Sequence, residues 1–134
     1  MLIAARERGV RVQVIVPGVN DSRFGRAASR SRWGKLFAAG VEFYSYQPAM
    51  FHSKTMMVDD LLTTVGSTNF DNRSFGINDE VNVNILDARV AHRSRLIFEA
   101  DLARSHPITR AEFESRPAIV KAFDRFCGLF RSQM

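Results

Sequence analysis

Hydrophobic and polar residues alternate in several short stretches of this chain, and such alternation is typical of half-buried β-strands. Valines occupy every second position from Val10 to Val16, and Pro17-Gly18 ends the pattern. The same reasoning predicts strands at residues 41–46, 52–58, 62–67 and 81–86. Asp59-Asp60 stands between the second and third of these segments, and we expect a tight turn there because aspartate tolerates turn conformations.

Helical spacing and capping residues occupy the stretches before and between these strands. Residues 2–8 have the pattern of the last turns of a helix that ends at Gly9. Any of Asn20, Asp21 and Ser22 can cap a second helix, which we expect to continue to Ala39 and stop at Gly40. Because the chain opens within a helix, we expect the first elements of its fold to be absent.

Three further helices are predicted in the last third of the chain. Asp87 can cap a helix over residues 88–104, and Thr109 and Glu112 have the spacing of a capping box. After Pro117 the apolar residues again keep helical spacing, and we expect the aromatic residues among them to be core or packing surface and not a cofactor site: Ile119, Ala122, Phe123, Phe126, Leu129 and Phe130. Helices that alternate with strands predict an α/β fold, with a mixed, largely parallel sheet flanked by helices.

Length and composition limit the possibilities further. A chain of 134 residues, of which 46% are hydrophobic and 25% charged, is typical of one globular domain. Its net charge of +5 favours an anionic partner such as nucleic acid, acidic lipid or a phosphate ester, without choosing among them. No apolar run approaches the length of a membrane-spanning helix, so we expect no transmembrane segment.

The cysteine and histidine content argues against disulfide and metal sites. Cys127 is the single cysteine, so we expect it to be a small core residue. The three histidines, at positions 52, 92 and 106, lack ligand spacing, and we expect His92 and His106 to be surface residues. We therefore expect no metal and no cofactor.

One segment carries the chemistry, because His52, Lys54 and Asp59 form the pattern His-x-Lys-x-x-x-x-Asp. On an extended segment, side chains two residues apart point the same way, so the imidazole and the ammonium should lie together. An imidazole can attack a phosphodiester as nucleophile while the lysine offsets charge on the phosphate oxygens. Asp59 lies an odd number of residues from His52 and should face away from it, so we assign it a scaffolding role in the turn.

Gly66-Ser67-Thr68-Asn69 extends this pattern on the next predicted strand. Ser67 and Asn69 are again two residues apart and could add neutral donors around the same phosphate. Gly66 would let the backbone approach closely.

Residues 52–69, continued by Phe70–Phe75 and Asn78–Val81, resemble the phospholipase D superfamily, and within it the bacterial cardiolipin synthase branch. Gln47–Met50 before the motif and Asp71–Ser74 after it are similar to that branch, and the resemblance covers essentially residues 1–134 as one phospholipase-D-like catalytic domain. It implies a two-step transfer in which one histidine is phosphorylated and a second protonates the leaving alcohol. It also implies that Glu80 orients the nucleophilic histidine, while Asp71 and Arg73 could contact a headgroup or form a structural ion pair.

Members of this family assemble their site from two such motifs, whereas this chain has one. By position it resembles the second of two repeats, with its N-terminus incomplete. The resemblance therefore implies a partner half-site, from an N-terminal repeat or from a second copy of the chain.

A basic segment precedes the motif, with Arg23, Arg26, Arg30, Arg32 and Lys35 interleaved with Phe24, Trp33 and Phe37. A cationic helix with outward aromatic side chains could lie at an anionic bilayer surface. An ordinary exposed helix with its aromatic side chains turned inward is an equal alternative.

The expected function is thus phosphatidyl transfer between phosphatidylglycerol molecules through a phosphohistidine, on the cytoplasmic side of a bacterial inner membrane with peripheral contact. Two alternatives stay open. The same site could hydrolyse phosphodiesters, as a phospholipase D or a metal-independent nuclease, although nucleic acid is the less expected substrate. The chain could also be a non-catalytic remnant that binds lipid or a partner.

Overall fold

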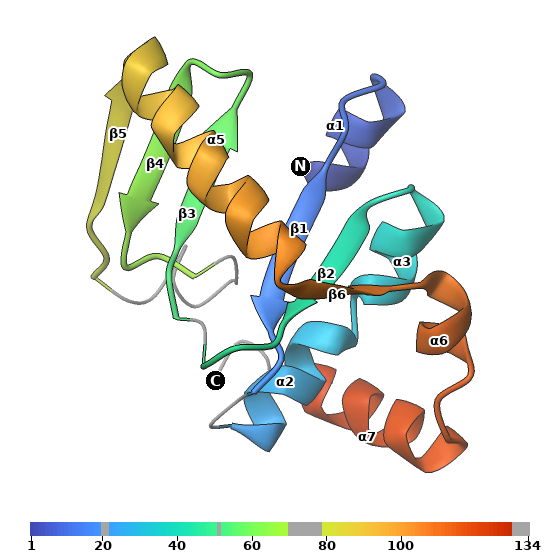
Figure 1. The fold of residues 1–134 in the computed structure, drawn as a ribbon. Coiled ribbons are helices and arrows are strands. Elements are labelled where there is room, and N and C mark those ends of the chain that lie inside the picture. Colours follow the sequence, from blue (N-terminus) through green and yellow to red (C-terminus); the bar gives the residue numbers. More distant parts are fainter. Residues whose placement is uncertain (20–21, 51, 70–78, 130–134) are drawn as a thin grey trace.

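A computed structural model describes residues 1–19, 22–50, 52–69 and 79–129, which form two three-stranded sheets with flanking helices (Figure 1). In the first sheet, β1 (Gln13–Pro17) lies parallel to β2 (Glu42–Tyr46), and β6 (Ser105–Ile108) lies antiparallel to β2 on its other side. In the second sheet, β3 (Thr55–Val58), β4 (Leu62–Gly66) and β5 (Asn82–Leu86) are antiparallel neighbours in that order.

The α/β class with flanking helices is confirmed, but the expectation of a largely parallel sheet is wrong. Among the described strands, only β1 and β2 pair in parallel. Residues 59–61 are too few to return the chain to a parallel position, so β3 and β4 must form a hairpin. Asp59 and Asp60 both adopt left-handed backbone conformations, with φ of 51° and 52°, which aspartate tolerates better than most residues.

The helices begin and end close to the predicted signals. α1 (Leu2–Glu7) leads to Gly9 in a left-handed conformation, and the Ser22 hydroxyl caps α2 (Arg23–Arg30) by accepting a hydrogen bond from the Gly25 amide. Asp87 caps α5 (Ala88–Ala103) through the amides of Arg89 and Val90. Thr109 and Glu112 form the predicted capping box of α6 (Arg110–Glu114), and α7 (Ala118–Leu129) follows. None of the described helices combines the length and apolarity that crossing a bilayer requires.

The main core lies on the first sheet. Trp33, Val41 and Phe43 are buried, and the Trp33 and Phe43 rings stack with their centroids 4.7 Å apart. Of the valines in the predicted alternation, Val12, Val14 and Val16 pack against this cluster, whereas Val10 is exposed and lies before the start of β1. On the second sheet, α5 contacts all three strands (Figure 1).

One expectation for the helical segments needs correction. The helix expected to reach Ala39 is two helices, because α2 ends at Arg30 and α3 (Trp33–Ala38) starts anew. Its aromatic side chains divide: Trp33 is in the core and Phe37 packs against it, whereas Phe24 is 55% exposed.

Of the two roles expected for the aromatic residues of α7, core or packing surface, the structure excludes the core, because the described residues of this helical face are exposed to differing degrees: Ile119, Ala122, Phe123, Phe126 and Leu129. Cys127 is the exception among those described and is buried as predicted. Helical spacing predicts that these apolar residues share one face of α7, but it does not show whether another element covers that face. β6 was not predicted, because four residues that include His106 and Pro107 show no strand pattern.

Candidate functional site

The residues of the sequence motif gather at one end of the β3–β4–β5 sheet. β3 begins, β4 ends and β5 begins at this end, because neighbouring strands run in opposite directions (Figure 1). The backbone pairing of Gly66 with Asn82, and a hydrogen bond from the Gly66 amide to the Lys54 carbonyl of 3.1 Å, align the three segments. The sheet thus brings together residues that lie up to 30 positions apart in sequence.

His52 and Lys54 lie side by side, as expected. The Lys54 Nζ is 2.9 Å from Nδ1 and 3.0 Å from Nε2 of His52, and it also donates to the His52 carbonyl at 3.0 Å. His52 is exposed and Lys54 is half-buried, so a ligand in solvent can reach the imidazole. The strand expected over 52–58 begins only at Thr55, and His52 and Lys54 lie in the segment that leads into it. Their contact therefore depends on the reach of the lysine side chain as well as on strand geometry.

A glycine is required at position 66 because the backbone there packs closely against the start of β5. A Cβ added there would overlap the Val81 carbonyl and the side chain of Asn82, so no larger residue fits without moving β5. The sequence predicted a close approach to a phosphate. The structure shows a close approach of Gly66 to the start of β5, and the approach to a phosphate stays a prediction.

Ser67 and Asn69 follow the end of β4, and both are exposed. The Ser67 hydroxyl accepts a hydrogen bond of 3.0 Å from the Val81 amide, while its own donor contact to the Val81 carbonyl is long, at 3.5 Å. Ser67 therefore holds β4 to β5, and its proton remains weakly bound and accessible to an anion.

Asn82 also shapes this end of the sheet, although the sequence interpretation gave it no role. Its amide nitrogen donates to the Thr68 hydroxyl at 2.7 Å, and its oxygen accepts from the Thr68 amide at 3.4 Å. The sequence gave no signal for this role, because Asn82 takes a polar position of an alternating strand just as Asn84 does. Asn82 thereby fixes the segment between Ser67 and Asn69.

Glu80 is half-buried and stands two residues before Asn82, at the end of the sheet where His52 and Lys54 lie. The orientation of His52 by Glu80 stays a prediction. Asp71 and Arg73 lie outside the described residues.

Asp59 occupies the opposite end of the β3–β4 hairpin, roughly 16 Å from Lys54 at the usual rise of a strand. The neighbouring Asp60 forms an ion pair of 2.8 Å with Arg95 on α5. Asp59 thus belongs to the turn, as expected from its odd spacing, and the turn is attached to the helix through Asp60.

The described residues contain no cluster of three or more histidine, cysteine, aspartate or glutamate side chains that could hold a metal ion. The chemistry that the end of the sheet can offer comes from an imidazole, an ammonium, a hydroxyl and amide groups. These groups suit an anionic ligand with tetrahedral oxygens.

Comparison with known proteins agrees with this geometry. Residues 1–102 match the family described as "Cardiolipin synthase, PLD-like domain". A probable cardiolipin synthase of Bacillus subtilis (strain 168) is 40% identical over 129 residues, which are 96% of this chain and 26% of that protein. Cardiolipin synthase A of Proteus mirabilis (strain HI4320) is 38% identical over 126 residues, which are 94% of this chain and 26% of that protein. The chain therefore spans about a quarter of the length of these relatives.

Two crystal structures share the fold. Nuc of Salmonella typhimurium, a phospholipase D family member, matches with a TM-score of 0.67 and 21% identity, over 80% of this chain and 70% of Nuc. Phosphatidylserine synthase of Haemophilus influenzae Rd KW20 matches with a TM-score of 0.64 and 16% identity, over 98% of this chain and 37% of that chain. Together with the family match, these findings show that the chain belongs to the cardiolipin synthase family of phospholipase-D-like domains.

Proposed function

We propose that this chain supplies one histidine half-site of a phosphatidyltransferase of the cardiolipin synthase type. The observation that carries the proposal is the contact of the Lys54 ammonium with the exposed His52 imidazole. In the first step, an imidazole nitrogen of His52 attacks the phosphorus of phosphatidylglycerol. The bond from phosphorus to the oxygen of the headgroup glycerol breaks, and a histidine of a second half-site gives that oxygen a proton.

In the second step, a hydroxyl of another phosphatidylglycerol attacks the phosphorus and the bond to His52 breaks. The second histidine accepts the proton of that hydroxyl, and cardiolipin leaves. The reverse assignment, with His52 as the general acid, uses the same geometry.

Lys54, Ser67 and Asn69 would hold the non-bridging oxygens, and Glu80 would orient His52. Gly66 and Asp59 would act through the sheet and its turn. Asp71 and Arg73 would contact the headgroup.

The chain would be the second repeat of its enzyme, so the other half-site comes from an N-terminal repeat or from a second copy. It would contact the cytoplasmic face of a bacterial inner membrane peripherally. Relatives named as cardiolipin synthases support the lipid substrate over nucleic acid.

The test is turnover of phosphatidylglycerol in mixed micelles, with products separated by mass spectrometry. Cardiolipin and glycerol indicate transfer, phosphatidic acid indicates hydrolysis, and cleaved DNA with intact lipid would exclude the proposal. His52→Ala should abolish turnover, whereas His106→Ala, which removes an exposed imidazole from β6, should not change it. A phosphatidyl adduct on a peptide containing His52 would identify the nucleophile.

An experiment in which parent and His52→Ala chains are mixed shows whether the second half-site comes from a second copy of the chain. If two copies of His52 form one site, an equal mixture with His52→Ala retains about one quarter of the activity, because only dimers of two unaltered chains are active. Independent sites retain about one half. A monomeric chain that stays inactive would instead support the non-catalytic remnant.

A further inference from the structure

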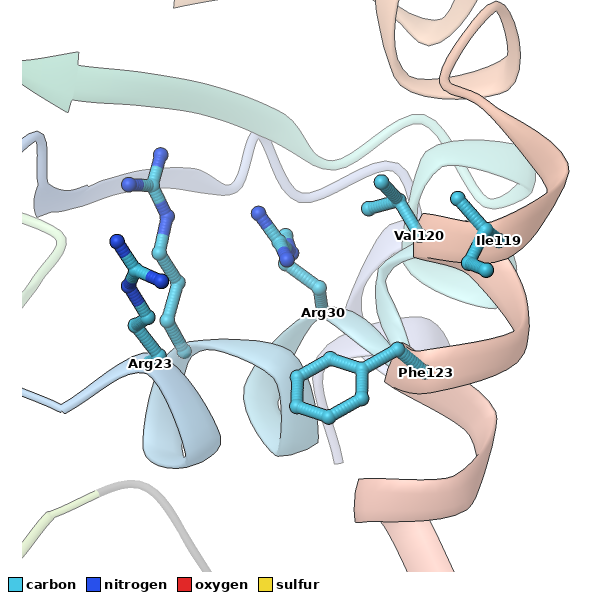
Figure 2. A pocket seen from close by; sticks show the side chains of 6 residues that line it. Arg23, Arg30, Ile119, Val120 and Phe123 are labelled. Atoms are coloured by element: carbon cyan, nitrogen blue, oxygen red, sulfur yellow. The ribbon is translucent and has the colours of Figure 1, made fainter.

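A groove of about 410 Å³ lies between α2 and α7, away from the His52 site. Figure 2 shows Arg23 and Arg30 projecting from α2, and Ile119, Val120 and Phe123 projecting from α7. Arg26 completes the lining. One wall of the groove is therefore cationic and the other is apolar, and none of the lining residues is acidic.

The positive charge of the groove is only partly neutralised. Arg30 donates to Asp124 at 2.8 Å, but Asp124 also binds Arg116 at 2.6 Å. Within the part of the chain that the structure describes, no ion pair joins Arg23 or Arg26 to an acidic residue. Burial, and then repulsion from Arg30, lowers the pKa of Arg26. An anion placed between these guanidinium groups would relieve that repulsion.

The apolar wall continues beyond the groove along α7. Ile119, Phe123 and Phe126 are spaced as one face of a helix and are 79%, 39% and 55% exposed. Phe24 of α2 adds to this surface, with its ring centroid 5.5 Å from that of Phe123. Apolar side chains gathered in this way and bordered by arginine are characteristic of an interaction site.

We propose that this α2–α7 groove docks the chain on a bilayer by binding acidic phospholipids. Arg23 and Arg26 would bind the headgroup phosphate, while Ile119 and Phe123 would enter the hydrocarbon boundary. An acidic lipid offers both an anion and hydrocarbon, which matches the two walls, whereas nucleic acid and free phosphate offer only the anion. The site goes beyond the proposed transfer reaction, because it contains none of the residues of the His52 site.

The proposal can be tested by co-sedimentation of the full chain with vesicles of phosphatidylcholine, with or without about 30 mol% phosphatidylglycerol as the anionic component. The chain should bind only the anionic vesicles. Arg23→Gln should lower the partition coefficient roughly fivefold, and the double change with Arg26→Gln about 30-fold. Replacing Ile119 and Phe123 with serine should lower it about tenfold or more, since burial of these side chains in the bilayer is lost.

Matched controls distinguish a loss of binding at this groove from the effects of lower net charge and of misfolding. Arg89→Gln with Arg93→Gln removes the same charge from the exposed surface of α5 and should change binding by less than about twofold. Each variant should keep the circular dichroism spectrum and urea midpoint of the parent. Because the assay measures binding without turnover, its result does not depend on whether His52 transfers a phosphatidyl group.

Three results would overturn the proposal. Equal losses in the α2 and α5 double variants would show that only net charge matters. Release of the chain by inorganic phosphate at constant ionic strength would identify a site for free phosphate. Self-association that is lost in Phe123→Ser, with unchanged vesicle binding, would assign the groove to a second copy of the chain.

Discussion

Removal of the Asp124 carboxylate should destabilise this protein more than removal of an exposed acidic side chain. The Asp124 side chain is 3% exposed and lies between Arg30 and Arg116, each 19% exposed. One carboxylate oxygen accepts from Arg30 at 2.8 Å and the other from Arg116 at 2.6 Å. Asp124→Ala would leave two largely buried guanidinium groups with no counter-charge between them.

Breaking a buried ion pair by removing one partner typically costs about 3–5 kcal/mol. We therefore expect Asp124→Ala to lower the free energy of unfolding by about that amount. Asp124→Asn keeps nearly the same volume but loses the charge, so most of the loss should persist. That comparison separates the charge from the small cavity that alanine leaves.

Urea unfolding at neutral pH measures the effect. The matched control is Glu114→Ala, since Glu114 forms an i, i+4 pair with Arg110 in which both side chains are more than half exposed. Its loss should be below about 0.5 kcal/mol and should vanish in 1 M salt, whereas the Asp124 effect should remain. If Asp124→Ala destabilises no more than Glu114→Ala, the buried triad does not hold α2 to α7.

Three further predictions follow from the same structure. Gly66→Ala should lower the free energy of unfolding by about 1–3 kcal/mol, because its Cβ overlaps β5, whereas Gly34→Ala has room and should be neutral or stabilising in thermal melts. Lys54→Met should lower kcat roughly 10²–10³-fold with an unchanged urea midpoint, and an equal fall in stability would contradict a catalytic role. A hydrogen bond from Arg11 holds the pKa of Glu42 at about 2, below its ordinary value of 4.5. A depressed pKa stabilises the fold above pH 4.5, and this contribution is lost as the pH falls toward 2. Glu42→Gln should therefore cost at most about 1 kcal/mol at pH 7, and its urea midpoint should meet that of the parent near pH 2.

The elements of this fold were largely predictable because their signals are local. The valine alternation before Pro17, the caps at Ser22 and Asp87 and the capping box at Thr109 all depend on residues within one turn or one strand. The pairing of strands was not predictable in the same way. Only the three-residue connection after Val58 specified an antiparallel partner, and β6 joined the first sheet through contacts that no local pattern encodes.

In the candidate site too, features that depend on neighbouring residues were predictable, and features that depend on distant residues were not. The contact of His52 with Lys54 was expected from a spacing of two residues, and the remote place of Asp59 follows from its position in the turn that was predicted between the two strands. The role of Asn82 depends on Thr68, which is 14 positions away. The groove between α2 and α7 depends on Arg30 and Asp124, which are 94 positions apart. Contacts of that range come from tertiary packing, so the sequence showed a basic segment and an apolar stripe but not their meeting.

The exposure of His52 sets a condition on the proposed chemistry. Water that reaches a phosphorylated imidazole would favour hydrolysis over transfer to a second lipid. His52 lies at an exposed end of the sheet, so this chain by itself does not exclude water there. A second half-site placed over that end would supply both the missing acid and the exclusion of water. In the proposed mechanism, transfer to a second lipid therefore needs the partner half-site for two separate reasons: its histidine protonates the leaving glycerol, and its surface excludes water.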